Sequence, residues 1–178
     1  MMAGFACALV FVLMRLGRDG RWLPLYGGFC AIIAGTSGTG GLAGLCALLL
    51  PVFNLILWGL VRHFAVGQQG RLLASGRGLL PVVMTLLLQV VLAFFGAGLG
   101  LVPTFGIGLV LAGLCAAACG VALAQFCGLI MAVDGLMVMA AILPSWGLFV
   151  TAVALWAVMV FLALVLLPRL AWLRVEEG

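Results

Sequence analysis

The chain has 178 residues, of which 67% are hydrophobic and 7% are charged, and its formal net charge is +4. Soluble domains carry roughly 25% charged residues and about half apolar ones, so this composition excludes an ordinary soluble fold. Apolar runs of about 20 residues recur along the sequence, and each can cross a bilayer as a helix. The sequence therefore predicts an all-α fold, a polytopic integral membrane helical bundle in which residues 1–178 form a single transmembrane domain without a soluble domain.

The first half of the chain is expected to hold four membrane helices. A short first helix covers residues 2–14, and the basic loop "RLGRDGRW" follows it. The next apolar tract is too long for one span. The glycine- and hydroxyl-rich string "GTSGTGG", Gly35–Gly41, predicts a tight turn that divides this tract into helices Leu23–Ala34 and Leu42–Val61. A fourth helix is predicted from Leu79 to Gly98.

The arginine positions divide the second half. The tract Phe105–Leu143 contains no obvious loop. If it were one span, the tail "PRLAWLRVEEG" would lie opposite the first two basic loops, whereas two spans with a tight turn near Gln125–Gly128 put every arginine on one side. The positive-inside rule favours two spans. Pro144–Gly147 then forms an outer turn before a last helix, Leu148–Leu167. The expected result is about seven transmembrane helices in a bacterial inner membrane, with the N-terminus outside and the C-terminus in the cytoplasm.

Asp134 is the only charged residue between Arg77 and Arg169. An ionisable group inside an apolar span is costly and by default marks a functional site. Burial favours the neutral acid, so Asp134 is a candidate proton relay. The alternative is a neutral hydrogen-bonding bridge to another helix. The predicted turn near Gln125 places Asp134 about one and a half helical turns from the start of its helix. The other polar intramembrane candidates are three amides, Asn54, Gln89 and Gln125.

The chain lacks the parts of an enzyme that works alone. "GTSGTGG" contains the G-x-S-G string of intramembrane serine proteases, but the only histidine, His63, is predicted at the opposite side of the membrane from Ser37. Cys115 and Cys119 are one helical turn apart and could clamp a soft metal. Metal sites usually recruit further ligands, and cysteine also serves as a small packing residue. We expect no catalytic residue, no cofactor and no metal.

The segment Ala112–Leu143, "AGLCAAACGVALAQFCGLIMAVDGLMVMAAIL", resembles the paired central helices of the K-type subunit of complex I. It resembles more closely component E of hydrogenase-4 and formate hydrogenlyase complexes. In those subunits a "Gly-Leu-(Glu)-x-Met" or "Met-Glu-Asn-Gly" signature opens the helix after a short cytoplasmic turn, and "GLIMAVDG" is the matching run here. The early basic loop, the hairpin, the arginine-ended helix "ILWGLVRHF" and the final "LVLLPRLAW" match as well.

The departures from that family concern charged residues. The family's glutamate falls on Val133 or a neighbour, beside Asp134; a family lysine is replaced within Leu48–Leu50; and the basic turn is replaced by "GVALAQ". The resemblance implies an accessory or structural subunit that lines or supports a proton pathway. Its implied partners are antiporter-like and redox-module membrane subunits within the lipid bilayer, with no nucleic acid.

Two other classes stay open. A small-solute transporter, or its membrane-embedded substrate-binding component, can use glycine-interrupted helices such as the one containing Gly35–Gly41 to line its site. Such a protein needs several polar side chains that converge within the membrane. The other class is an assembly factor or insertase-like protein.

Overall fold

A computed structural model of the protein describes residues 23–64, 87, 91, 101–118 and 122–175. Within these residues the regular structure is helical and includes no strand, which confirms the all-α prediction. The predicted helices 2–14 and 79–98 fall almost entirely outside the described residues, and so does Gln89. The long helices are α2 (Leu23–Ser37), α3 (Gly40–Phe64), α5 (Leu101–Ala117), α6 (Ala122–Ile142) and α7 (Trp146–Val175).

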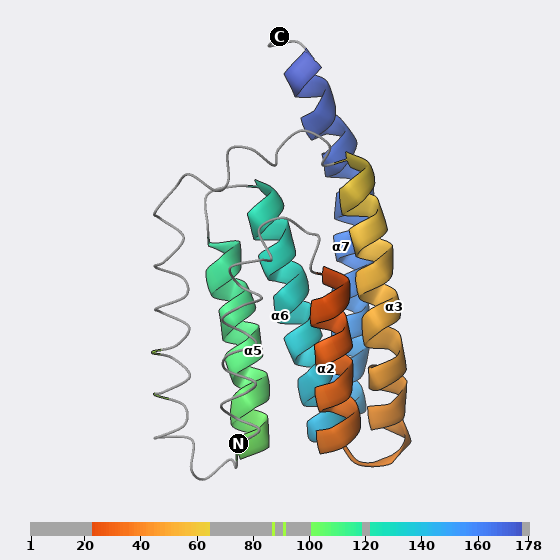
Figure 1. Ribbon diagram of the computed structural model, residues 1–178, viewed down its shortest axis with the longest axis vertical. Coiled ribbons are helices and arrows are strands. Elements are labelled where there is room, and N and C mark those ends of the chain that lie inside the picture. The colour runs from red at the N-terminus through yellow and green to blue at the C-terminus, as the bar shows by residue number, and fades with distance from the viewer. Residues whose placement is uncertain (1–22, 65–86, 88–90, 92–100, 119–121, 176–178) are drawn as a thin grey trace.

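These helices form one bundle of side-by-side helices (Figure 1). Among the described residues, three segments are long and apolar enough to cross a membrane: Gly40–Arg62, Gln125–Ile142 and Trp146–Val165. α2 is a shorter apolar helix. The protein is therefore embedded in a membrane. α6 occupies the centre, because it contacts α2, α3, α5 and α7.

The turn between α2 and α3 is shorter than the predicted turn Gly35–Gly41. α2 continues through Ser37, and the Gly38 N–H donates to the Ala34 carbonyl at 3.0 Å to close its last turn. Gly40 then starts α3 with a φ of +79°, a left-handed conformation that glycine adopts without strain. The helices extend into the glycine-rich string because each backbone N–H in an apolar environment needs a partner.

The division of the Phe105–Leu143 tract into two helices is confirmed, but the turn predicted near Gln125–Gly128 is wrong. α5 ends at Ala117 and α6 begins at Ala122, so the predicted turn lies inside α6. Gly128 has a packing role instead. A Cβ atom on Gly113 of α5 would lie 2.7 Å from the Gly128 carbonyl oxygen, which shows how closely the two backbones approach.

The α5–α6 contact depends on glycine at a further position. A Cβ atom on Gly135 of α6 would lie 2.8 Å from the Val110 backbone nitrogen of α5. Such close approach is how helices associate in lipid, where the hydrophobic effect contributes little. α5 and α6 therefore form a tightly packed antiparallel pair (Figure 1).

α7 begins two residues earlier than predicted because Ser145 caps it. The Leu148 N–H donates to Ser145 Oγ at 3.4 Å, and the Phe149 N–H donates to the Ser145 carbonyl at 3.1 Å. A serine oxygen in this position satisfies donors that the first helical turn leaves unpaired. Pro144, directly before the cap, separates the end of α6 from the start of α7.

The C-terminal ends of α3, α5 and α7 and the start of α6 lie at the same end of the bundle (Figure 1). We call this the arginine end, because α3 passes Arg62 there and α7 passes Arg169 and Arg174. The α2–α3 turn and the α6–α7 turn lie at the opposite end (Figure 1). This arrangement agrees with an uneven distribution of arginines across a membrane.

Candidate functional site

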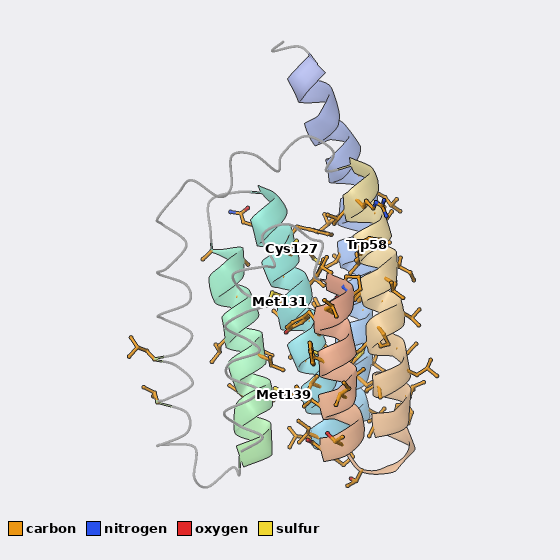
Figure 2. All side chains as sticks on the ribbon, viewed as in Figure 1. Trp58, Cys127, Met131 and Met139 are labelled. Carbon is orange, nitrogen blue, oxygen red and sulfur yellow. The ribbon has the colours of Figure 1, made fainter. Side chains whose placement is uncertain are left out.

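Asp134 lies in the middle of α6 rather than near its start. About 18 Å of helix separates it from Ala122 and about 12 Å from Ile142, at 1.5 Å per residue. Its side chain is 2% exposed. Met131, three residues before Asp134, lies at mid-length of α6, and Met139, five residues after it, lies toward the end that leads to α7 (Figure 2). The predicted position near the helix start is wrong because the turn before α6 comes several residues earlier than expected.

Asn54 of α3 is the hydrogen-bond donor to Asp134. Its Nδ2 lies 2.9 Å from Asp134 Oδ2 and also 2.9 Å from the carbonyl oxygen of Leu50, one turn earlier in α3. Asn54 is fully buried, and its other amide atom, Oδ1, is buried with no hydrogen-bond partner. The structure thus brings together two of the predicted polar residues. It leaves Gln125 exposed in the first turns of α6.

Gly27 of α2 makes room for the Asn54 side chain. A Cβ atom on Gly27 would lie 2.6 Å from Asn54 Nδ2 and 2.7 Å from Asn54 Cβ and Cγ. Real Cβ atoms do not approach other atoms so closely, so any larger residue at position 27 has to displace the amide. The next residue, Gly28, has nothing within 4 Å of the corresponding position.

Two residues of α2 that no sequence pattern marks as candidates complete the site. The Tyr26 hydroxyl donates to the Met131 carbonyl of α6 at 3.2 Å. Cys30, one helical turn further along α2, hydrogen-bonds to the Tyr26 side chain. Tyr26 is the only tyrosine in the chain. Its position within an apolar run is the sequence signal that could have identified it as a candidate site residue. We call Tyr26, Cys30, Asn54 and Asp134 the polar cluster.

No basic side chain in the described part of the structure pairs with Asp134. Apart from Asp134, the only charged residue whose side chain is described is Arg62, which is exposed at the arginine end. Its guanidinium carbon lies 5.2 Å from the centre of the Trp58 ring. The Asp134 carboxyl group therefore depends on one amide hydrogen bond, and a buried negative charge without a cation is costly.

Trp156 of α7 packs against the segment of α3 that carries Asn54. Its ring stacks on Phe53, with ring centroids 4.0 Å apart and an interplanar angle of 17°. The Trp156 Nε1 atom is buried and has no hydrogen-bond partner. The stack fixes α7 against α3 next to the polar cluster, and the indole N–H is a second unpaired polar atom in this region.

The pair Cys115 and Cys119, considered above as a clamp for a soft metal, is described only in part by the structure. Cys119 and the side chain of Cys115 lie outside the described residues. Among the described residues, no group of three or more His, Cys, Asp or Glu side chains is placed to hold a metal ion.

Comparisons of the chain with protein-family models, with curated proteins and with solved structures give no match. A buried carboxyl group with one amide donor joins α3 to α6 and lies within reach of a phenol on α2. Such a group can link helices, exchange a proton or accept a small cation.

Proposed function

We propose that the chain is an accessory, structural membrane subunit of a complex I-related or hydrogenase-type energy-converting complex. The observation that carries the proposal is the buried hydrogen bond between Asn54 and Asp134. It lies in the paired-helix segment that resembles those complexes and joins that segment to α3. In this role the Asp134 carboxyl acts first as a link between helices and secondarily as support for a proton pathway.

The outer faces of α3 and α7 support a position among other membrane components. In the apolar membrane-spanning windows only 28% of α3 and 17% of α7 is buried, against 67% of α6. The residues on these faces are large and apolar, so lipid chains or neighbouring helices can cover them without unpaired polar groups. They include Leu48, Val52 and Leu55 of α3, and Val150, Val158 and Phe161 of α7.

The proposed setting is a bacterial inner membrane crossed by about seven helices, with no soluble domain and with the arginine end in the cytoplasm. The positive-inside rule supports this orientation. Cysteine labelling in intact cells tests it with two positions at opposite ends, Thr39→Cys in the α2–α3 turn and Arg174→Cys near the end of α7. A membrane-impermeant reagent should label Thr39→Cys only; labelling of Arg174→Cys from outside overturns the orientation.

Co-purification tests the assembly itself. Mild detergent extraction should recover the chain with antiporter-like and redox-module membrane subunits, and recovery as a stable lone protein contradicts the proposal. The variant Asp134→Asn then separates two roles within such an assembly, because an amide can keep a bond to Asn54 but cannot carry a proton. Intact assembly with lost proton coupling indicates a relay, and unchanged coupling indicates a link between helices.

A second candidate is the membrane-embedded substrate-binding component of a small-solute transporter. One observation favours it: the polar cluster gathers side chains from three helices, as a solute site requires. Recovery of the chain with a transport ATPase or a solute-translocating subunit, in place of redox partners, supports this candidate over the first.

A further inference from the structure

We propose that the exposed face of α3 binds one anionic phospholipid, with the phosphate at Arg62 and an acyl chain along the helix toward Val52. The inference goes beyond the assembly role, because it concerns a surface of the chain itself and does not depend on which partners the chain has. The surface consists of one arginine at the arginine end of α3 and of exposed apolar and glycine residues toward the middle of the helix. We call it the lipid face, and its members are Val52, Leu55, Gly59 and Arg62.

The spacing of these residues places them on one side of α3. Successive members of the lipid face are three or four residues apart, and residues at that spacing are neighbours on the surface of an α-helix. The side chains of Val52 and Leu55 are 43% and 51% exposed, so they do not belong to the core of the bundle. An acyl chain that lies along this strip covers it without leaving a polar group unpaired.

Arg62 lies at the depth where a phospholipid carries its phosphate. The apolar segment of α3 that is long enough to cross a membrane, Gly40–Arg62, ends at this residue. The helix rises about 15 Å between Val52 and Arg62, at 1.5 Å per residue, and this distance is half of a hydrocarbon core about 30 Å thick. An acyl chain whose headgroup lies at Arg62 therefore covers Leu55 and ends near Val52, in the middle of the bilayer.

Trp58 holds the Arg62 guanidinium at this depth. The guanidinium carbon lies 5.2 Å from the centre of the Trp58 ring, a distance at which a cation is attracted to an aromatic face. Trp58 lies one helical turn before Arg62, near the arginine end of the bundle (Figure 2). Tryptophan is enriched at this depth in membrane helices. The guanidinium presents its N–H donors in a planar fork, which can bind two oxygens of one phosphate at once.

Gly59 leaves room for the lipid beside Arg62. Gly59 is exposed, and among the described residues no atom lies within 4 Å of the position that a Cβ atom would take there. The glycerol and upper acyl part of a lipid can therefore approach the backbone of α3 between Leu55 and Arg62.

The charge of Arg62 selects the headgroup. In phosphatidylcholine the phosphate is accompanied by an ammonium group in the same headgroup, whereas in phosphatidylglycerol it is not. An arginine near the membrane surface therefore favours phosphatidylglycerol, as basic residues generally attract anionic lipids.

Native mass spectrometry of the purified full chain, with whatever partners copurify, tests the proposal directly. The sample is incubated with equal amounts of phosphatidylglycerol and phosphatidylcholine that carry the same acyl chains. We expect one retained phosphatidylglycerol per chain, with a preference of at least about fivefold over phosphatidylcholine, equivalent to about 1 kcal/mol. This measurement uses the unmodified sequence, so it does not depend on whether a variant folds.

Two pairs of variants locate the site. Arg62→Gln should remove the preference for phosphatidylglycerol, whereas Arg174→Gln, which removes the same charge from α7 at the same end of the bundle, should keep it. Gly59→Leu should weaken phosphatidylglycerol binding at least about fivefold, because its side chain fills the space beside Arg62. The matched control Gly44→Leu is an exposed position of α3 toward the opposite end of the bundle, with equally open space at its Cβ position, and should bind the lipid like the unmodified chain.

Several results overturn the proposal. Equal retention of the two lipids overturns it, as does a preference that Arg62→Gln leaves unchanged. Equal losses in Arg62→Gln and Arg174→Gln also overturn it, because the preference then reflects the overall positive charge of the arginine end. Cross-linking of Leu55→Cys to another subunit, without retained phosphatidylglycerol, shows instead that a neighbouring helix covers the lipid face. A lone protein that prefers phosphatidylglycerol refutes the assembly role and keeps this inference, and a multi-subunit complex without the preference does the reverse.

Discussion

The link between α3 and α6 predicts an energetic coupling between Asn54 and Asp134 that a double-mutant cycle can measure. Leucine is the replacement at both positions, because it is branched at the same atom as asparagine and aspartate and adds no hydrogen-bonding group. Asn54→Leu removes the donor to Asp134 and leaves a buried carboxyl group unpaired. Asp134→Leu is milder, because the Asn54 amide keeps its bond to the Leu50 carbonyl.

The expected magnitudes follow from the burial of the two side chains. Leaving a buried polar group without its partner costs about 1–3 kcal/mol, so we expect Asn54→Leu in that range. Replacing both partners by apolar groups of similar shape is nearly neutral. The double variant should therefore be less destabilised than the sum of the single variants by roughly 0.6–1.7 kcal/mol, the range of interhelical hydrogen bonds in membranes.

Unfolding of the purified chain in mixed micelles with increasing denaturing detergent gives the four free energies of the cycle. A control cycle pairs Asn54→Leu with Thr151→Ala. The Thr151 hydroxyl donates within α7, to the Gly147 carbonyl at 2.9 Å, and is exposed, so its coupling to Asn54 should be zero within error. A coupling between Asn54 and Asp134 that is no larger than this control refutes the interhelical link.

Two further predictions concern packing. Gly113→Ala should destabilise the protein by about 1–3 kcal/mol, because the new Cβ would collide with the backbone of Ala132 in α6; the control Gly44→Ala, with nothing within 4 Å of its Cβ position, should have little effect. Comparable unfolding of both variants contradicts the close α5–α6 contact. Trp156→Phe should be neutral or stabilising by up to about 1 kcal/mol in the same assay, because it removes an unpaired buried N–H while an aromatic ring still stacks on Phe53. A clear loss of stability shows instead that the indole N–H has a bonding partner in the folded protein.

The helices themselves could be predicted from the sequence because their signals are local. Long apolar runs require helices in a membrane, and arginine positions restrict how those runs fold back on each other. The arginine positions correctly predict that the Phe105–Leu143 tract contains two helices. The predicted position of the turn was wrong because glycine is typical of turns. In the structure Gly128 instead lies within α6, where it allows the close contact with Gly113 of α5.

The polar cluster could be predicted only in part, because it depends on how each helix is rotated about its axis. The described helices α2, α5, α6 and α7 are apolar on nearly every side, so they lack the periodicity that normally identifies an inward face. The sequence selected Asp134 and Asn54 as unusual residues but gave no reason to pair them. The sequence does not indicate which side of α2 faces α3 and α6. Tyr26 and Gly27 could therefore be identified as part of the site only from the structure.

Stability alone does not explain why a polar pair occupies the centre of this bundle. A leucine pair of similar shape holds two helices about as well, and replacing buried polar pairs by apolar ones is often neutral or stabilising. The observed pair also leaves the Asn54 Oδ1 atom unpaired and the Asp134 carboxyl without a cation in the described structure. Both features cost energy in a purely structural link, and they favour the proposed additional role of Asp134 in support of a proton pathway. The double variant Asn54→Leu/Asp134→Leu therefore separates the two explanations, because it should keep most of the stability of the unmodified chain, whereas an assembly that uses Asp134 in a proton pathway should lose its proton coupling.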